Sequence, residues 1–150
     1  MKKLFFLLIL LLNTMILASC VNVINDPFKV AEIFDDEGYS VSIIVDRDDI
    51  NEMRNTVGIT GKKISHVLYI TKNGIGINHT NSDGAFIYFE NDNAAKESKT
   101  IFEEYMLSHN IKKEIVKSSE NVVFIGSEEL WNIFEYESRQ PLIDISVNGS

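Results

Sequence analysis

Residues 86–97 read FIYFENDNAAKE, and this stretch contains the end of one secondary-structure element and the start of the next. The four apolar residues at its beginning are typical of a buried strand, and small and apolar residues at helical spacing follow from Ala94. Between them, Asn91 and Asp92 can bind the free backbone N–H groups of a helix start and complement the positive end of the helix dipole. The stretch therefore predicts a buried strand that runs directly into a capped helix.

Two other stretches have the same arrangement, SIIVDRDDINEM at 42–53 and VVFIGSEELWNI at 122–133. In each, an apolar run ends at Asp46 or Ser127, and an acidic helix start follows. Helix capping therefore explains most of the acidic residues at these junctions. It also explains DRDD at 46–49, because the spacing of this motif does not match the twelve-residue calcium loop. The intervals between the stretches are irregular, which indicates recurring strand-to-helix units and not a sequence repeat.

Four helices are predicted, and each presents an apolar stripe. A first helix begins at Asp26 and ends before Gly38; its stripe is formed by Phe28, Ala31 and Phe34, with Val30 and Ile33 beside them. The last, near 127–137, carries Trp131 and should face the core. A helix near 48–57 has Ile50, Met53 and Val57 on one side. The strongest periodic signal belongs to a helix near 92–109, and one side of this helix is formed by Ala94, Ala95, Ser98, Ile101, Phe102, Tyr105, Met106 and His109.

Strands are predicted between these helices, and they define the fold class. The candidates lie at 39–46, 64–71, 75–80, 85–90, 111–117 and 121–126. Asn73-Gly74 is a preferred two-residue hairpin turn, which favours antiparallel neighbours. The order α-β-α-β-β-β-α-β-β-α then predicts an α+β fold, with helices packed against a mainly antiparallel sheet. We expect a single domain at 26–137 and a tail at 138–150 that could add an edge strand.

The N-terminal segment has a different composition. Two lysines precede an apolar run from Leu4 to Leu12 and a shorter one from Met15 to Leu17, which together are too short for a permanent membrane span. The segment ends in LASC, residues 17–20. This motif resembles the lipobox of bacterial lipoproteins, in which an apolar residue and two small ones precede a lipidated cysteine. The resemblance covers only the first 20 residues.

What the resemblance implies is a signal peptide at 1–19, cleavage after Ser19 and a lipidated tether at 20–25 with palmitate or similar chains on Cys20. The protein would then face outside the cytoplasm, anchored to the cell membrane. Cys20 is the only cysteine in the chain, so no disulfide competes for it. Several acyl chains on one residue would give durable attachment, whereas one chain binds reversibly.

The charge of the chain excludes some partners. The formal net charge is -8, and removal of Lys2 and Lys3 with the signal peptide would change it from -8 to -10. An acidic surface repels phosphate backbones, so we expect no nucleic acid partner and no basic patch for anionic lipid. The expected partners are the membrane, through Cys20, and an unidentified envelope protein or small ligand.

Two histidines are the candidates for a metal site. Pairing across the Asn73-Gly74 turn would place Leu68 opposite His79 and leave His66 diagonal to His79 on the same face. That face would continue with Phe86, Tyr88 and Glu90. Two imidazoles could begin a metal site, although the simpler interpretation is that both are ordinary sheet residues, since no HExxH or comparable motif is present.

No other motif indicates catalysis or a cofactor. VGITGKK at 57–63 departs from a phosphate-binding loop in spacing and position and predicts a turn. No Gly-x-Ser-x-Gly motif occurs, and a two-lobed solute receptor would need a longer chain. We therefore expect no cofactor and a small non-catalytic binding or scaffolding domain in the cell envelope. The alternative is a metal-dependent envelope hydrolase that uses His66 and His79.

Overall fold

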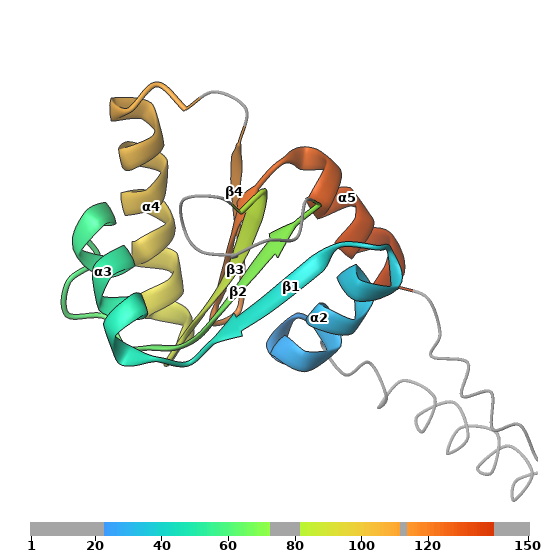
Figure 1. The fold of residues 1–150 in the computed structure, drawn as a ribbon. Coiled ribbons are helices and arrows are strands. Elements are labelled where there is room, and N and C mark those ends of the chain that lie inside the picture. Colours follow the sequence, from blue (N-terminus) through green and yellow to red (C-terminus); the bar gives the residue numbers. More distant parts are fainter. Residues whose placement is uncertain (1–22, 73–81, 112–113, 140–150) are drawn as a thin grey trace, which may run out of the picture.

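The computed structural model describes residues 23–72, 82–111 and 114–139, and they form one five-stranded antiparallel sheet with helices on both faces (Figure 1). The helical elements are the short 3-10 helix η1 (Val23–Asn25), α2 (Pro27–Asp36), α3 (Arg47–Val57), α4 (Asp92–Ser108) and α5 (Glu128–Glu137). The strands are β1 (Ser40–Ile44), β2 (Ile64–Thr71), β3 (Gly84–Phe89), β4 (Ile115–Ser119) and β5 (Val122–Gly126), in the spatial order β1-β2-β3-β5-β4. The predicted α+β class and element order are confirmed, while the predicted strand at 75–80 lies outside the described residues.

Side-chain caps form each of the three strand-to-helix junctions that the sequence predicted. The Asp46 carboxylate accepts a hydrogen bond from the Asp48 N–H at 2.9 Å, at the start of α3. Asn91 Oδ1 accepts from the Ala94 N–H at 3.0 Å, and Ser127 Oγ starts α5 in the same way. These bonds satisfy backbone N–H groups that have no partner inside the helix. The acidic junctions therefore have the structural role predicted for them.

The two faces of the sheet carry alternate residues of each strand. On β3, Phe86 and Tyr88 face α2 and α5, whereas Ala85, Ile87 and Phe89 face α3 and α4. Figure 1 shows the two helix pairs on opposite sides of the strands. We call these sides the α2–α5 face and the α3–α4 face.

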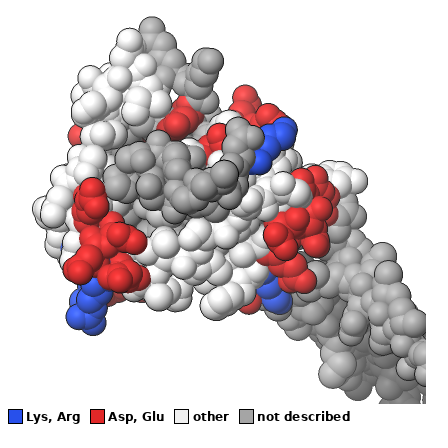
Figure 2. All heavy atoms as spheres, viewed as in Figure 1, with Lys and Arg blue, Asp and Glu red and all other residues white. Residues whose placement is uncertain are grey.

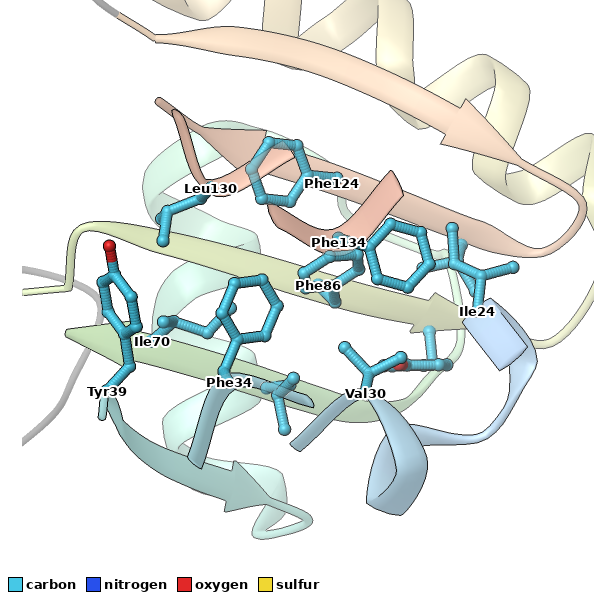
Figure 3. Packing of buried hydrophobic residues seen from close by; sticks show 12 residues of the cluster. Ile24, Val30, Phe34, Tyr39, Ile70, Phe86, Phe124, Leu130 and Phe134 are labelled. Atoms are coloured by element: carbon cyan, nitrogen blue, oxygen red, sulfur yellow. The ribbon is translucent and has the colours of Figure 1, made fainter. Parts of the chain in front are cut away.

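The α2–α5 face is filled by aromatic rings (Figure 3). Phe86 lies at its centre, with ring centroids 4.8 Å from Phe124, 5.2 Å from Phe134 and 5.9 Å from Phe34. Trp131 packs beside Phe124 at 5.3 Å, as its helical position predicted. Offset and tilted ring pairs of this kind add to the free energy gained from burial.

Paired glycines allow α5 to approach this face closely. Gly84 and Gly126 are partners in neighbouring strands. A Cβ atom on Gly84 would stand 2.7 Å from Leu130 Cδ1, and one on Gly126 would stand 2.8 Å from the ring of Phe124. Leu130 of α5 and the ring of Phe124 can pack this closely because neither glycine has a side chain.

The pairing of β2 differs from the prediction. Leu68 pairs with Ile43 of β1 on one side and with Phe86 of β3 on the other. Both edges of β2 are thus occupied at this position, so the predicted pairing of Leu68 with His79 is wrong. The Asn73-Gly74 dipeptide predicted a local hairpin, but the register of β2 is decided by its pairing with β3, which lies farther along the chain.

Three smaller differences concern the ends of elements. Ile24 is only 3% exposed and joins the core of the α2–α5 face, so Val23–Asn25, assigned above to the tether, belong to the folded part. Phe28 is 68% exposed and leaves the stripe of α2. β4 begins at Ile115 and not at 111, because the chain turns at Asn110 with a positive φ of 58° after α4. Of the tail predicted at 138–150, with its possible edge strand, Ser138 and Arg139 form a turn after α5 and residues 140–150 lie outside the described residues.

Candidate functional site

The residues singled out by the sequence fall in different parts of the chain. Cys20 and His79 lie outside the described residues. His66 lies in β2, half-buried, and its ring meets that of Tyr88 edge-on with centroids 6.3 Å apart. His66, Phe86 and Tyr88 do share one side of the sheet, as predicted, since His66 pairs with Tyr88 and Leu68 with Phe86.

The described surroundings of His66 consist of packed side chains and contain no group of metal ligands. Burial raises the pKa of Tyr88, with a smaller contribution from Asp26, and the Tyr88 hydroxyl is buried without a hydrogen-bond partner in the described structure. Glu90, expected on the same face, lies beyond the end of β3 and forms an ion pair with Lys63 at 3.2 Å. Within residues 23–72, 82–111 and 114–139, no three His, Cys, Asp or Glu residues are grouped so that they could hold a metal ion.

A cavity lies on the other face of the sheet, between α3, α4 and the strands. Its volume is about 250 Å³. Its interior is formed by the buried residues Met53 of α3, Phe102 and Met106 of α4, and Tyr69, Ala85 and Ile87 of the sheet. Its mouth is formed by the more exposed residues Thr56, Ser82, Tyr105, Ile111 and Glu114. We call this cavity the α3–α4 pocket.

The sequence of α4 explains why the pocket forms at this end of the sheet. Near its start, α4 faces the sheet with Ala94, Ala95 and Ser98, which are small and allow close approach. Near its end it faces the sheet with Phe102 and Met106, which hold the helix axis farther away. Figure 1 shows α4 diverging from β3 in this direction.

The floor of the pocket has too little side-chain volume to fill the resulting space. β3 contributes Ala85 and the backbone of Gly84 at the point where α4 is farthest away. Larger residues of the same strand, Ile87 and Phe89, lie nearer the start of α4. Large side chains on the helix thus stand opposite small ones on the sheet, and the mismatch leaves the cavity of about 250 Å³.

Few polar groups line the α3–α4 pocket. Burial raises the pKa of Tyr69 to about 12, assisted by Asp49 and Glu52. The Thr56 hydroxyl donates to the Glu52 carbonyl at 2.9 Å. Glu114 is exposed as a residue, yet neighbouring protein atoms withdraw enough water from its carboxyl group to raise the pKa of Glu114. The pocket therefore offers apolar walls, hydroxyl groups and a carboxyl group at its mouth.

One side of the mouth is braced by the end of α4. The His109 ring stacks on Tyr105 with centroids 4.0 Å apart and an interplanar angle of 27°. His109 Nδ1 lies 2.9 Å from the Tyr105 carbonyl oxygen and 3.0 Å from Ser108 Oγ. These contacts restrict Tyr105 at the pocket edge, and they give His109, which the sequence placed in the core stripe, an exposed supporting position.

Acidic side chains outside the pocket gather in separate patches. Figure 2 shows one over α3 and another on the side where α2 and α5 lie. A shallow depression on the latter side is lined by Glu37, Glu128, Glu129 and Glu137. Carboxylates exposed to water in this way set the field around the molecule, and they disfavour the approach of anions.

Sequence reasoning did not identify the α3–α4 pocket. The alternation of β2 and β3 places Tyr69 and Ala85 on one face, and the stripe of α4 supplies Phe102 and Met106 opposite them. The available signal for a cavity was the small residue Ala85 on the strand opposite the large residues Phe102 and Met106 on the helix. Glu114 was assigned to the interior of a strand at 111–117, so its position at the mouth was not predicted.

Comparisons with known proteins add no relative. No protein-family model matches the chain, and neither the curated proteins nor the solved structures contain a match to it.

Proposed function

We propose that this protein is a membrane-anchored lipoprotein whose α+β domain binds a small, largely apolar molecule outside the cytoplasm. The α3–α4 pocket is the observation that carries the binding function. It combines a buried apolar interior with a polar mouth, which is the usual composition of a small-molecule site. The LASC motif supports the anchor, through lipidation of Cys20.

The pocket is preferred to the His66 region for a physical reason. A metal-dependent hydrolase would need several ligands around one ion and an open coordination position. His66 packs against a buried tyrosine, and the strand register that would have brought His79 beside it is not the one observed. In the part of the chain that the structure describes, no helix has the length and hydropathy to cross a membrane; the proposed attachment is through lipid.

The anchor is tested by mass spectrometry of the mature N-terminus and by fractionation of cells that express the Cys20→Ser variant. We expect a lipidated N-terminal cysteine in the native chain and loss of the variant from the membrane fraction. An unmodified thiol on an intact leader would contradict the anchor. It would leave the pocket unaffected, because the two claims depend on separate parts of the chain.

Binding is tested with a neutral apolar probe, 2-(4-fluorophenyl)ethanol, followed by fluorine NMR on the full chain in lipid nanodiscs. Empty nanodiscs measure partition of the probe into lipid. Met106→Trp should fill the interior and abolish the protein-dependent signal. Leu107→Trp is the matched control, since the neighbouring Leu107 is 82% exposed on the same helix and should leave binding unchanged. Equal binding by both variants would show that the probe does not occupy this pocket.

A further inference from the structure

The α3–α4 pocket has an uneven distribution of polarity that restricts its ligand. Its interior residues are apolar apart from the Tyr69 hydroxyl, and its described lining includes one charged residue, Glu114, at the mouth. A ligand that satisfies both parts must have an apolar body and a polar group at one end. This step rests on the proposed function, because it assumes that the pocket holds a small molecule.

The volume of the pocket sets the size of the apolar body. A dry cavity of about 150 Å³ is enough for benzene. The α3–α4 pocket, at about 250 Å³, has room for one ring with a short arm. Phe102 and Tyr69 can contact such a ring from the helix and from the sheet. Longer acyl chains would exceed the interior.

Glu114 is the charged residue of the described lining, and it decides the sign of the polar end. An anionic group at the mouth would meet the Glu114 carboxylate. A cationic group would pair with the Glu114 carboxylate. In the protein without ligand, neighbouring atoms partly desolvate this carboxylate, which disfavours its charged form and raises the pKa of Glu114. The interaction with a cation offsets that cost.

We infer that the α3–α4 pocket binds a small apolar amine, with its ring or branched body inside the pocket and its protonated nitrogen paired with the Glu114 carboxylate at the mouth. Tyr105 stands at the same mouth, where its ring stacks on that of His109.

Three probes that share one body test this inference. They are 2-(4-fluorophenyl)ethylamine, 2-(4-fluorophenyl)ethanol and 4-fluorophenylacetate, each titrated into the full chain in nanodiscs and followed by fluorine NMR. We expect the amine to bind about two- to fivefold tighter than the alcohol, which is the strength of an ion pair near the surface, and the acid to bind most weakly. Raising the salt concentration should reduce the advantage of the amine.

Glu114→Gln is the decisive variant. It keeps the shape of the side chain, so the alcohol should bind as before, while the amine should lose its advantage. Glu104→Gln is the matched control, because Glu104 is an exposed acid of α4 that does not line the pocket. The control should keep the order of the three probes.

The outcomes separate this inference from the proposed function. If the alcohol binds and Met106→Trp abolishes its binding, but the amine binds no tighter, the pocket stands and the amine preference is overturned. The inference also fails if Glu114→Gln and Glu104→Gln reduce amine binding equally, since general surface charge would then be the cause. If no probe binds in a Met106-dependent manner, the proposed binding function and the inference both fail.

Discussion

The two faces of the sheet are built from alternate residues of the same strands, yet one is closed and the other contains a pocket. The α2–α5 face is filled around Phe86 by rings from both helices and from β5. The α3–α4 face combines small residues at one end of the helix with large ones at the other, and α4 diverges from the sheet. The comparison teaches that the size pattern of the side chains, more than their hydrophobicity, determines whether an apolar face is closed.

The largest expected effect comes from opening the closed face. Phe86→Ala removes a fully buried ring that three other rings contact, and it should cost about 3–5 kcal/mol of the free energy of unfolding. Urea unfolding of the purified full chain measures this cost. Met106→Ala, on the pocket face, should cost less, about 2 kcal/mol, because its site already adjoins a cavity. Equal costs would contradict the difference between the faces.

A smaller effect is expected where α5 approaches the closed face. Gly84→Ala should lower the free energy of unfolding by about 1–3 kcal/mol, since the new methyl group collides with Leu130. A double-mutant cycle with Leu130→Ala, measured by urea unfolding, provides the control. The alanine at 84 should cost much less when Leu130 is already truncated. Simple additivity of the two changes would show that the collision is not the cause.

The helix caps should show no difference between the faces. Asn91→Ala removes the cap of α4, and Ser127→Ala removes the cap of α5. Each should cost about 1 kcal/mol, because the lost hydrogen bond is local to the helix start. Thermal unfolding of both variants checks the comparison. A much larger cost at one cap would mean that packing around it, and not the hydrogen bond, supplies the stability.

The smallest effect concerns Glu114 and pH. Burial raises the pKa of Glu114 above its ordinary value of 4.5, so the folded protein binds this proton more tightly than the unfolded chain. Its contribution to stability is therefore present at low pH and is lost as the pH rises from about 4.5 through the raised pKa. Glu114→Gln should lose this dependence and be slightly more stable than the native chain at pH 7.

The comparison is made by urea unfolding at pH 4 and pH 7. The advantage of Glu114→Gln should be smaller than a cap effect, since the carboxyl group is partly solvated, and should disappear at the lower pH. Glu104→Gln again serves as the control and should show no such change. A variant less stable than the native chain at pH 7 would indicate that Glu114 has a stabilising partner.

Much of the fold could be predicted from local patterns in the sequence. Polar caps such as Asp46 and Asn91 follow apolar strands, and they locate the junctions because their hydrogen bonds involve only nearby residues. The stripe of α4 was predicted for the same reason, and its buried members Phe102 and Met106 face the sheet. Only His109, at its end, is exposed.

Features that depend on distant contacts were not predicted. The pairing of β2 with β1 joins strands separated by α3, and its pairing with β3 joins strands that lie more than ten residues apart in the chain, so no local pattern encodes either register. Ile24 was assigned to a tether because its environment is supplied by residues far away in the sequence. The pocket likewise depends on how Ala85 meets α4 across the sheet. The roles proposed for Cys20 and the pocket remain predictions.

The position of the chain ends has a practical consequence. Residues 23–25 pack with α2, and residues 138–139 follow α5, so both ends of the described chain emerge on the side opposite the α3–α4 pocket. The sheet thus separates any support coupled to these ends from the mouth where a ligand enters. Coupling the protein to a sensor surface through a residue at either end of the described range, near 23 or 139, should leave ligand access unobstructed.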